Sequence, residues 1–196
     1  SEGMRIYLKD LKPTSIEDLI AMNALYRPGP MQFIPSFINR KHGKEKVEYP
    51  HELLKDILEN TYGIMVYQEQ IMQAAQIMAN YSLGEADILR RIMGKKKADQ
   101  LPAEEEKFVK RAVEKGIDIK KAKDIFKIMA HFAGYGFNRS HSAAYSLVAY
   151  QTAYLKANYK AEYMAAVLQR NKNDIKSITF FMDECKRQSI PVLGPD

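Results

Sequence analysis

Cysteine is almost missing from this sequence of 196 residues, since Cys185 is the only one. A single thiol excludes a disulfide within the chain and indicates a reducing compartment. No apolar run approaches the ~20 residues that a membrane-spanning helix needs, so no membrane partner is expected. Together these absences predict a cytoplasmic protein.

Three signatures of nucleotide and metal chemistry are also missing. The sequence has no G-x-x-x-x-G-K-[ST] loop, and no G-x-G-x-x-G motif follows a strand. It has no Asp-x-Asp pair that could hold the two metal ions of nucleotidyl transfer. The acidic run Glu104–Glu106 is a poor metal cage because consecutive side chains diverge on a helix. We therefore expect no metal site in this chain.

The bulk composition is that of a globular domain with a mildly basic surface. Apolar residues make up 46 % and the net charge is +6. This length predicts that residues 1–196 form a single domain or one large subdomain. The start, Ser1-Glu-Gly-Met-Arg5, resembles neither a signal peptide nor an initiator, so we interpret the chain as a fragment of a longer protein. The charge is compatible with an anionic partner without requiring one.

Helical spacing of apolar residues dominates the sequence and predicts an all-α, mainly helical fold with at most one short β element. Capping boxes are expected at 14–17 and 82–85, and the one plausible strand is 62–67. The tyrosines of the longest helix, among them Tyr150 and Tyr154, are expected to pack in the core or between helices rather than to form a stacking platform for bases. Helices are predicted at about 14–25, 34–42, 52–60, 68–80, 82–93, 102–116, 118–132, 140–158, 161–169 and 174–188.

A glycine-rich turn, residues 132–138, is the first candidate site. It leads directly into the longest predicted helix through Asn138, Arg139, Ser140 and His141. A helix start carries unpaired N–H groups and about half a unit of positive charge. With a cation and hydroxyls added, this start suits a phosphate. The alternative is an ordinary glycine turn with serine caps.

A basic cluster on a preceding helix is the second candidate. Its side chains suit a ligand with several phosphates or a nucleic-acid backbone. The alternative is a solvated helix face on which Asp87 and Arg91 form an ordinary helix pair. The cluster consists of Arg90, Arg91, Lys95, Lys96 and Lys97.

Three polar residues, Gln68, Glu69 and Gln70, begin an otherwise apolar helix. Acids and amides suit helix starts, so a structural role is favoured. Contact with a base or sugar edge of DNA is the open alternative, for Gln68 and Gln70 in particular.

Five segments of the sequence, in order, resemble the fingers domain of the bacterial C-family replicative DNA polymerases. The resemblance extends over essentially the whole chain, which makes it far more specific than any single motif. The segments are 24–31, 61–70, 81–87, 89–96 and 132–145.

This resemblance implies an irregular helical fingers domain within a DNA-directed DNA polymerase, a nucleotidyltransferase of bacterial DNA replication. Such a domain binds the triphosphate of the incoming deoxynucleoside triphosphate (dNTP) and template-primer DNA. The family's three metal-binding aspartates lie in the palm, before the fingers, so no catalytic residue is expected here and the isolated fragment is expected to be inactive. Mg²⁺ is expected for the intact polymerase. The implied partners are DNA, dNTPs, the palm and thumb domains and replisome subunits, in the bacterial cytoplasm.

Mapped onto this sequence, the resemblance assigns the triphosphate to residues of both candidate sites. His141 is expected to bind a phosphate oxygen or to protonate the departing pyrophosphate. Lys96, Gln68 and Gln70 are possible contacts to DNA. Both clusters are expected to meet in one electropositive hollow. The phosphate-binding residues are Arg90, Arg91, Lys95, Lys97, Asn138, Arg139, Ser140 and His141.

Two other functions remain compatible with the residues alone. A helical module could hold nucleic-acid backbones through 95–97 and would then show salt-sensitive binding without nucleotide dependence. A scaffold piece that binds proteins would show neither property.

Overall fold

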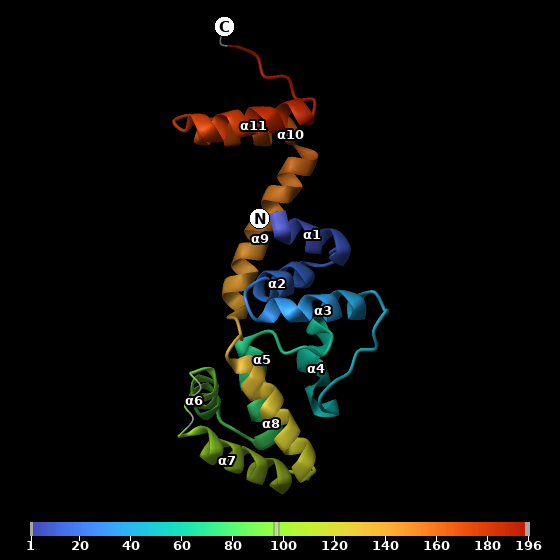
Figure 1. The fold of residues 1–196 in the computed structure, drawn as a ribbon, viewed down its shortest axis with the longest axis vertical. Helices are drawn as coiled ribbons and strands as arrows, with labels where there is room; N and C mark the ends of the chain where they lie inside the picture. Colours follow the sequence, from blue (N-terminus) through green and yellow to red (C-terminus); the bar gives the residue numbers. More distant parts are fainter. Residues whose placement is uncertain (1, 96, 98, 195–196) are drawn as a thin grey trace. The chain divides into compact units, whose positions relative to one another are not determined.

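The computed structural model describes residues 2–95, 97 and 99–194 (Figure 1). These residues form eleven α-helices and three short 3-10 helices without a strand, which confirms the all-α prediction. Contacts between residues divide the chain into two compact units, residues 1–146 and 147–196.

The first helices of the first unit surround an apolar cluster of their own. They are α1 (Glu2–Leu11), α2 (Ile16–Leu25), the 3-10 turn η1 (Pro30–Phe33) and α3 (Ile34–Lys41). Leu11, Ile34 and Phe37 are fully buried in this cluster. Helix α1 was not expected from the sequence.

The start of α2 differs from the predicted capping box by one residue. Ser15, rather than Thr14, is the N-cap, and the reciprocal partner is Asp18 rather than Glu17. The Asp18 carboxylate accepts hydrogen bonds from the backbone N–H groups of Thr14, at 2.8 Å, and Ser15, at 3.2 Å. It also pairs with Lys41 at 2.9 Å, and both side chains are buried. A partner from α3 thus explains why the aspartate takes the capping position.

Four helices supply most of the second apolar cluster of the first unit (Figure 1). They are α5 (Gln68–Ala79), α6 (Leu83–Gly94), α7 (Leu101–Glu114) and α8 (Ile119–Ala133). The capping box of Ser82 and Glu85 is confirmed, and Asp118 caps α8 through the N–H of Lys121 at 2.9 Å. The Glu85 carboxylate also pairs with Arg111 at 3.0 Å, which ties α6 to α7.

Residues 52–61 form three short turns instead of the single predicted helix. They are η2 (Glu52–Leu54), α4 (Lys55–Leu58) and η3 (Glu59–Thr61). Leu54 and Leu58 are buried, whereas Leu53 is 48 % exposed.

The predicted strand at 62–67 is wrong. The segment is largely buried, but within the described part of the chain its only β-type contact is an isolated parallel bridge between Tyr67 and Phe137. The Gln70 side-chain oxygen accepts hydrogen bonds from the backbone N–H groups of Val66, at 2.8 Å, and Tyr67, at 2.9 Å. A side chain therefore satisfies the donors that a neighbouring strand would otherwise take.

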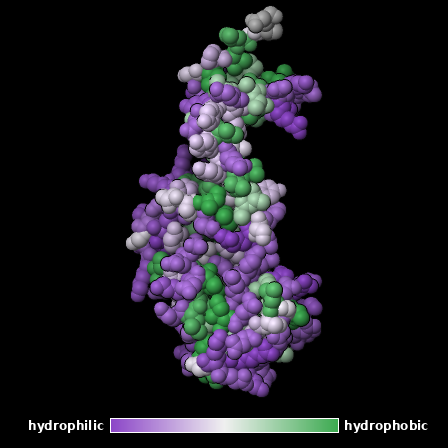
Figure 2. Space-filling model, turned by 180° about the vertical axis from the view of Figure 1, so that it is seen from behind, coloured by the Kyte–Doolittle hydropathy of each residue, from purple (hydrophilic) through white to green (hydrophobic). Residues whose placement is uncertain are grey.

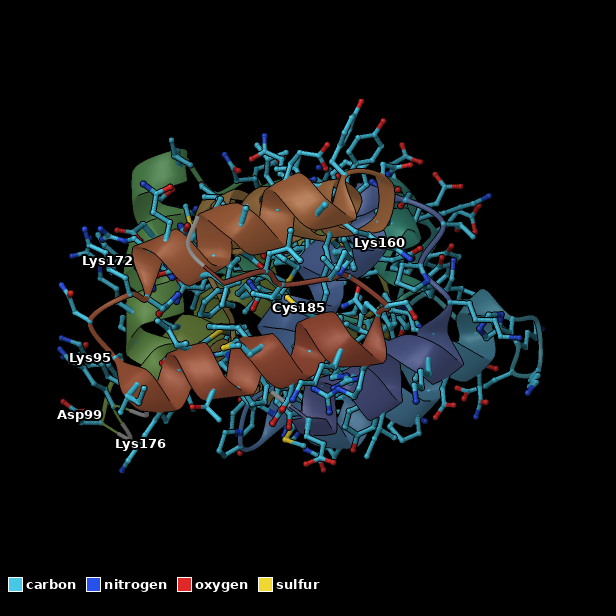
Figure 3. The ribbon with its side chains drawn as sticks, turned by 90° about the horizontal axis from the view of Figure 1, so that it is seen from above. Lys95, Asp99, Lys160, Lys172, Lys176 and Cys185 are labelled. Carbon is cyan, nitrogen blue, oxygen red and sulfur yellow. The ribbon has the colours of Figure 1, made fainter. Side chains whose placement is uncertain are left out.

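The second unit contains the end of α9 (Arg139–Asn158), a helix that begins in the first unit, followed by α10 (Lys160–Arg170) and α11 (Ile175–Arg187). Figure 3 shows α10 and α11 side by side with Cys185 between them, and this thiol is fully buried. Lys156 of α9 pairs with Glu184 of α11 at 2.7 Å. Helices α10 and α11 thus share a small core, and this ion pair joins α9 to α11.

Tyrosine packing on α9 was predicted wrongly. Tyr150 and Tyr154 are 50 % and 49 % exposed, and Tyr145, in the first unit, is 62 % exposed. Figure 2 shows hydrophobic residues at the surface of the second unit as well, where Val148 and Leu155 are exposed. These side chains lack the helix neighbours that the sequence pattern led us to expect.

Candidate functional site

The glycine turn, residues 132–138, is fixed against the segment that leads into α5. The N–H of Gln68 donates to the carbonyl of Phe137 at 2.9 Å, and the N–H of Phe137 donates to the carbonyl of Val66 at 3.2 Å. The Gln68 side-chain amide donates to the carbonyl of Gly136 at 3.0 Å. Gln68, predicted as a possible DNA contact, therefore uses its amide N–H to position the turn.

A second anchor of the turn, which the sequence did not indicate, comes from the end of α2. The Arg27 guanidinium donates to the carbonyls of Tyr135, at 2.7 Å, and Ala24, at 3.0 Å. It also lies 4.3 Å from the centre of the Phe137 ring. Gly29 follows with φ of 99°, and a Cβ atom there would overlap the Tyr135 ring. The Arg-Pro-Gly-Pro segment is therefore a support for the turn.

The start of α9 is occupied by a carboxylate from α5. Both oxygens of Glu69 accept the backbone N–H of Arg139 at 3.1 Å, and one accepts the side-chain amide of Asn138 at 3.0 Å. The Asn138 side-chain oxygen in turn accepts the N–H of His141 at 2.9 Å. An anion is thus already seated at this helix end, where its charge is favourable. From the sequence, Glu69 was expected to cap its own helix or to meet a base or sugar edge, and its contact with α9 was not predicted.

The side chain of Arg139 is also engaged. Its guanidinium pairs with Glu17 of α2 at 2.6 Å, and this hydrogen bond raises the pKa of Arg139 above its usual value. The same guanidinium lies 5.8 Å from the centre of the Tyr67 ring. Burial, reinforced by the charge of Glu17, raises the pKa of the Tyr67 hydroxyl. That hydroxyl is buried without a hydrogen-bond partner among the described residues.

The remaining side chains of the helix start divide into an anchor and two exposed groups. The Ser142 hydroxyl donates to the carbonyl of Ile20 at 2.6 Å and is buried. Ser140 and His141 are exposed, and the His141 ring lies 4.7 Å from that of Tyr145. Of the hydroxyl and imidazole groups predicted here, Ser140 and His141 are therefore open to a ligand.

The two arginines of the basic cluster share one acid. Asp87 accepts hydrogen bonds from Arg90 at 2.7 and 3.0 Å and pairs with Arg91 at 2.7 Å. The hydrogen bond from Arg90 is the main reason why the pKa of Asp87 is lowered. The Arg91 side chain is 64 % exposed and that of Arg90 only 21 %. Arg91 is thus the more accessible of the two.

The lysines after α6 are exposed, and their helix end lies against the end of α8. Lys95 and Lys97 form no ion pair with the residues that the structure describes, and Lys96 lies outside the described residues. A Cβ atom on Gly94 would lie 3.2 Å from the carbonyl oxygen of Ala133, the second residue of the glycine turn. The backbone of the basic cluster thus approaches the turn at this point.

Arg139 and Ser140 line a cavity of about 530 Å³. Its other walls come from α5 and from residues 56–60 rather than from α6. The single hollow shared by both clusters therefore remains a prediction.

Gln70 is a structural residue, and its predicted contact with a base edge is not retained. It is 5 % exposed, and its amide nitrogen donates to Ile57 and to Thr61 at 3.0 and 2.9 Å. Since its oxygen accepts two backbone N–H groups, no polar group is left for a base.

No three His, Cys, Asp or Glu side chains come together as a metal site among residues 2–95, 97 and 99–194. We therefore derive no chemical step through a metal in this chain. Within the same residues, no helix has the length and apolar character needed to cross a membrane.

Comparison with known proteins connects this geometry to a family. Residues 1–116 match the family model described as the bacterial DNA polymerase III alpha subunit finger domain. DNA polymerase III subunit alpha of Borreliella burgdorferi is 56 % identical over all 196 residues, and that of Chlamydia pneumoniae is 57 % identical over 195. That of Treponema pallidum is 53 % identical. The chain covers only 16–17 % of the length of these relatives.

These matches confirm the resemblance that the sequence motifs indicated. The chain belongs to the family of bacterial DNA polymerase III alpha subunit finger domains.

Proposed function

We propose that the chain is the fingers portion of a bacterial replicative DNA polymerase and binds the triphosphate of the incoming dNTP and template-primer DNA. The observation that carries the proposal is the pair of exposed lysines, Lys95 and Lys97, at the helix end that abuts the glycine turn in a member of this family. Cations without acidic partners are free to bind phosphates at no cost of breaking an ion pair.

In this proposal the arginines of α6 exchange Asp87 for phosphate oxygens. A solvent-exposed ion pair stabilises a protein by only about 0–1 kcal/mol, so replacing Asp87 by a phosphate at Arg91 costs little free energy. The guanidinium fork suits the paired oxygens of a phosphate. Arg90 is less exposed and donates two hydrogen bonds to Asp87, so its exchange costs more free energy than that of Arg91.

The turn contributes side chains rather than its helix end. Because Glu69 already accepts the backbone N–H of Arg139, the phosphates contact the side chains of Ser140 and His141. Arg139 joins them by leaving Glu17, and Asn138 holds the turn in place. His141 binds a phosphate oxygen or protonates the departing pyrophosphate.

In the intact polymerase, the primer 3′-hydroxyl attacks the α-phosphate of the dNTP in line. Such transfer depends mainly on positioning and charge neutralisation, which these cations supply. Mg²⁺ and the aspartates that hold it belong to the palm, outside this chain. The palm, the thumb and replisome subunits in the bacterial cytoplasm are its further partners.

The test is steady-state kinetics of an alpha subunit that contains this chain. The double variant Lys95→Ala/Lys97→Ala should lower kcat/KM for dNTP by at least ~10-fold, or about 1.4 kcal/mol, mainly through KM. Lys120→Ala/Lys121→Ala on α8 removes two exposed lysines of the same charge and should change nothing. An unchanged KM for dNTP in the first variant would contradict the proposal.

A matched pair of variants separates two roles of Arg139. If Arg139 only holds Glu17, then Glu17→Gln and Arg139→Ala should have equal effects on kinetics. If Arg139 binds phosphate, Arg139→Ala should lower kcat/KM for dNTP at least ~10-fold, whereas Glu17→Gln leaves the phosphate contact intact.

The alternative, a backbone-binding module without nucleotide dependence, predicts that Lys95→Ala/Lys97→Ala changes affinity for DNA but not KM for dNTP. We also expect the isolated chain to synthesise no DNA, because its described residues offer no metal site. Template-dependent synthesis by the isolated chain would show that this expectation is wrong.

A further inference from the structure

A second basic surface lies apart from the glycine turn, in a groove between α1 and α3. The groove has a volume of about 580 Å³. Buried Leu11 and Phe37 pack beneath the two helices, and His42 contacts the carbonyl of Asp10 at 2.9 Å. Lys41, at the end of α3, donates to Thr14 in the loop that follows α1, at 2.7 Å. The groove is therefore a built feature of the fold.

The charge of the groove is positive and unpaired. Lys9, Lys12 and Lys44 line it, and Asp10 is its one acidic residue. None of the three lysines forms an ion pair with a residue in the described ranges, whereas the neighbouring Lys41 forms an ion pair with Asp18. All three lysines are exposed. The groove thus presents a net charge of +2, from three lysines and one aspartate, to a ligand.

The backbone at Lys12 adds a second observation. Its φ is +46°, a left-handed conformation that costs a residue with a side chain about 1–2 kcal/mol relative to glycine. Glycine or asparagine would fit this position at lower cost. A lysine held there points to a use for its charge.

The other groups in the groove indicate which polyanion it suits. Tyr7 and Asn39 line it together with His42. The Tyr7 ring is held against Tyr26, with 5.9 Å between the ring centres. Proteins that bind single-stranded nucleic acid combine a positive groove along the backbone with aromatic rings on which bases stack. The bases of a duplex are stacked on one another and offer no free face to such a ring, so the ring favours a single strand.

We propose that the groove between α1 and α3 binds a short stretch of single-stranded nucleic acid, with Lys9, Lys12 and Lys44 on the phosphates and Tyr7 against a base. That this strand is the template of a polymerase rests on the proposed function. Binding of the strand itself does not rest on the proposed function, because it requires neither dNTP nor the residues of α6 and α9.

The test is fluorescence anisotropy of the 196-residue chain with a 5′-fluorescein-labelled oligothymidine of twenty nucleotides, over a series of NaCl concentrations. The variant Lys9→Gln/Lys12→Gly/Lys44→Gln removes three charges. Glycine at 12 also suits the left-handed backbone, so the fold is not penalised there. The control Lys120→Gln/Lys121→Gln/Lys127→Gln removes three exposed charges from α8. Circular dichroism should show unchanged helix content in both variants.

The groove variant should lose at least ~10-fold in affinity at low salt, and its salt slope should shrink by about 2, or ~0.7 for each of three phosphates. The control should keep both values. Equal losses in the two variants would mean that only the net charge matters, and this would overturn the proposal. So would an unmodified chain that binds no oligothymidine, or one that binds a hairpin duplex equally well.

Tyr7 gives an independent measurement. Tyr7→Phe keeps the ring and should keep the affinity, whereas Tyr7→Leu should lose at least ~5-fold through the missing base stack. Equal affinities of the two variants would remove the stacking role. If the groove variant binds DNA normally while the Lys95/Lys97 kinetics behave as expected, the groove proposal fails and the proposed function stands.

Discussion

Replacing Glu69 by alanine should destabilise the first unit by removing the carboxylate that holds the start of α9. The structure gives the size of the effect. Two donors lose their acceptor, the N–H of Arg139 and the amide of Asn138, each at about 3 Å. Hydrogen bonds to a charged group contribute roughly 1.5–3 kcal/mol each, and loss of a helix cap costs about 0.5–2 kcal/mol.

Two features keep the expected loss of unfolding free energy in Glu69→Ala at the lower end of these values. Asn138 still caps His141 with its own oxygen, and Glu69 is only partly buried, so water replaces some of the lost contacts. We expect Glu69→Ala to lower the free energy of unfolding by ~2 kcal/mol. Glu69→Gln keeps an acceptor oxygen without the charge and should cost about 1 kcal/mol.

Urea denaturation followed by far-ultraviolet circular dichroism measures these differences, and the Tm of Glu69→Ala should fall by roughly 4–8 °C. Gln73→Ala is the matched control, because Gln73 lies one turn further along α5, lines the same cavity and is exposed. If Glu69→Ala lies within about 0.5 kcal/mol of Gln73→Ala, the clamp does not stabilise α9 and the reasoning is refuted.

Further predictions concern the support of the turn and the buried acid of α2. Gly29→Ala should lower the free energy of unfolding by more than ~2 kcal/mol, because φ is +99° and the new Cβ would overlap Tyr135. Gly43→Ala, at φ +68° in open space, should lower it by only about 1 kcal/mol. Urea denaturation compares the two variants, and equal losses would show that the overlap with Tyr135 has no effect on stability. Burial disfavours the charged form of Asp18, but backbone hydrogen bonds and Lys41 lower its pKa below the ordinary 3.8. The ionised carboxylate therefore contributes its full stabilisation of the fold above about pH 4, and this contribution is lost as the pH falls through the lowered pKa. The stability gap between the unmodified chain and Asp18→Asn should therefore narrow below about pH 4 in urea denaturation, and a constant gap would refute the assignment.

Local signals predicted most of the helices. The capping pair Ser82 and Glu85 was predicted correctly, because the capping box is complete within four residues. The prediction of a strand at 62–67 was wrong, because an apolar pattern indicates that a segment is buried and does not indicate that it pairs with another strand. What replaces the missing strand neighbour is the side chain of Gln70, and no spacing rule signals that contact.

The candidate site was predictable only on its cationic side. Clusters of arginine and lysine are visible in sequence, but the acids that pair with them are not. Glu17 lies 122 residues from Arg139, and Glu69 lies 70 residues from it, so only the tertiary fold brings these carboxylates to α9. The exposure of Tyr150 and Tyr154 was missed for the opposite reason, because an apolar pattern does not say which neighbours are present.

The enclosed position of Cys185 has a practical consequence. The one thiol of the sequence is fully buried in the second unit, so it should react slowly with maleimide reagents. A cysteine introduced in the lining of the groove, for example at Asn39, could then carry a fluorophore or a spin label without first mutating the native cysteine. Distance and quenching measurements on such a labelled chain would report strand binding from a single, known position.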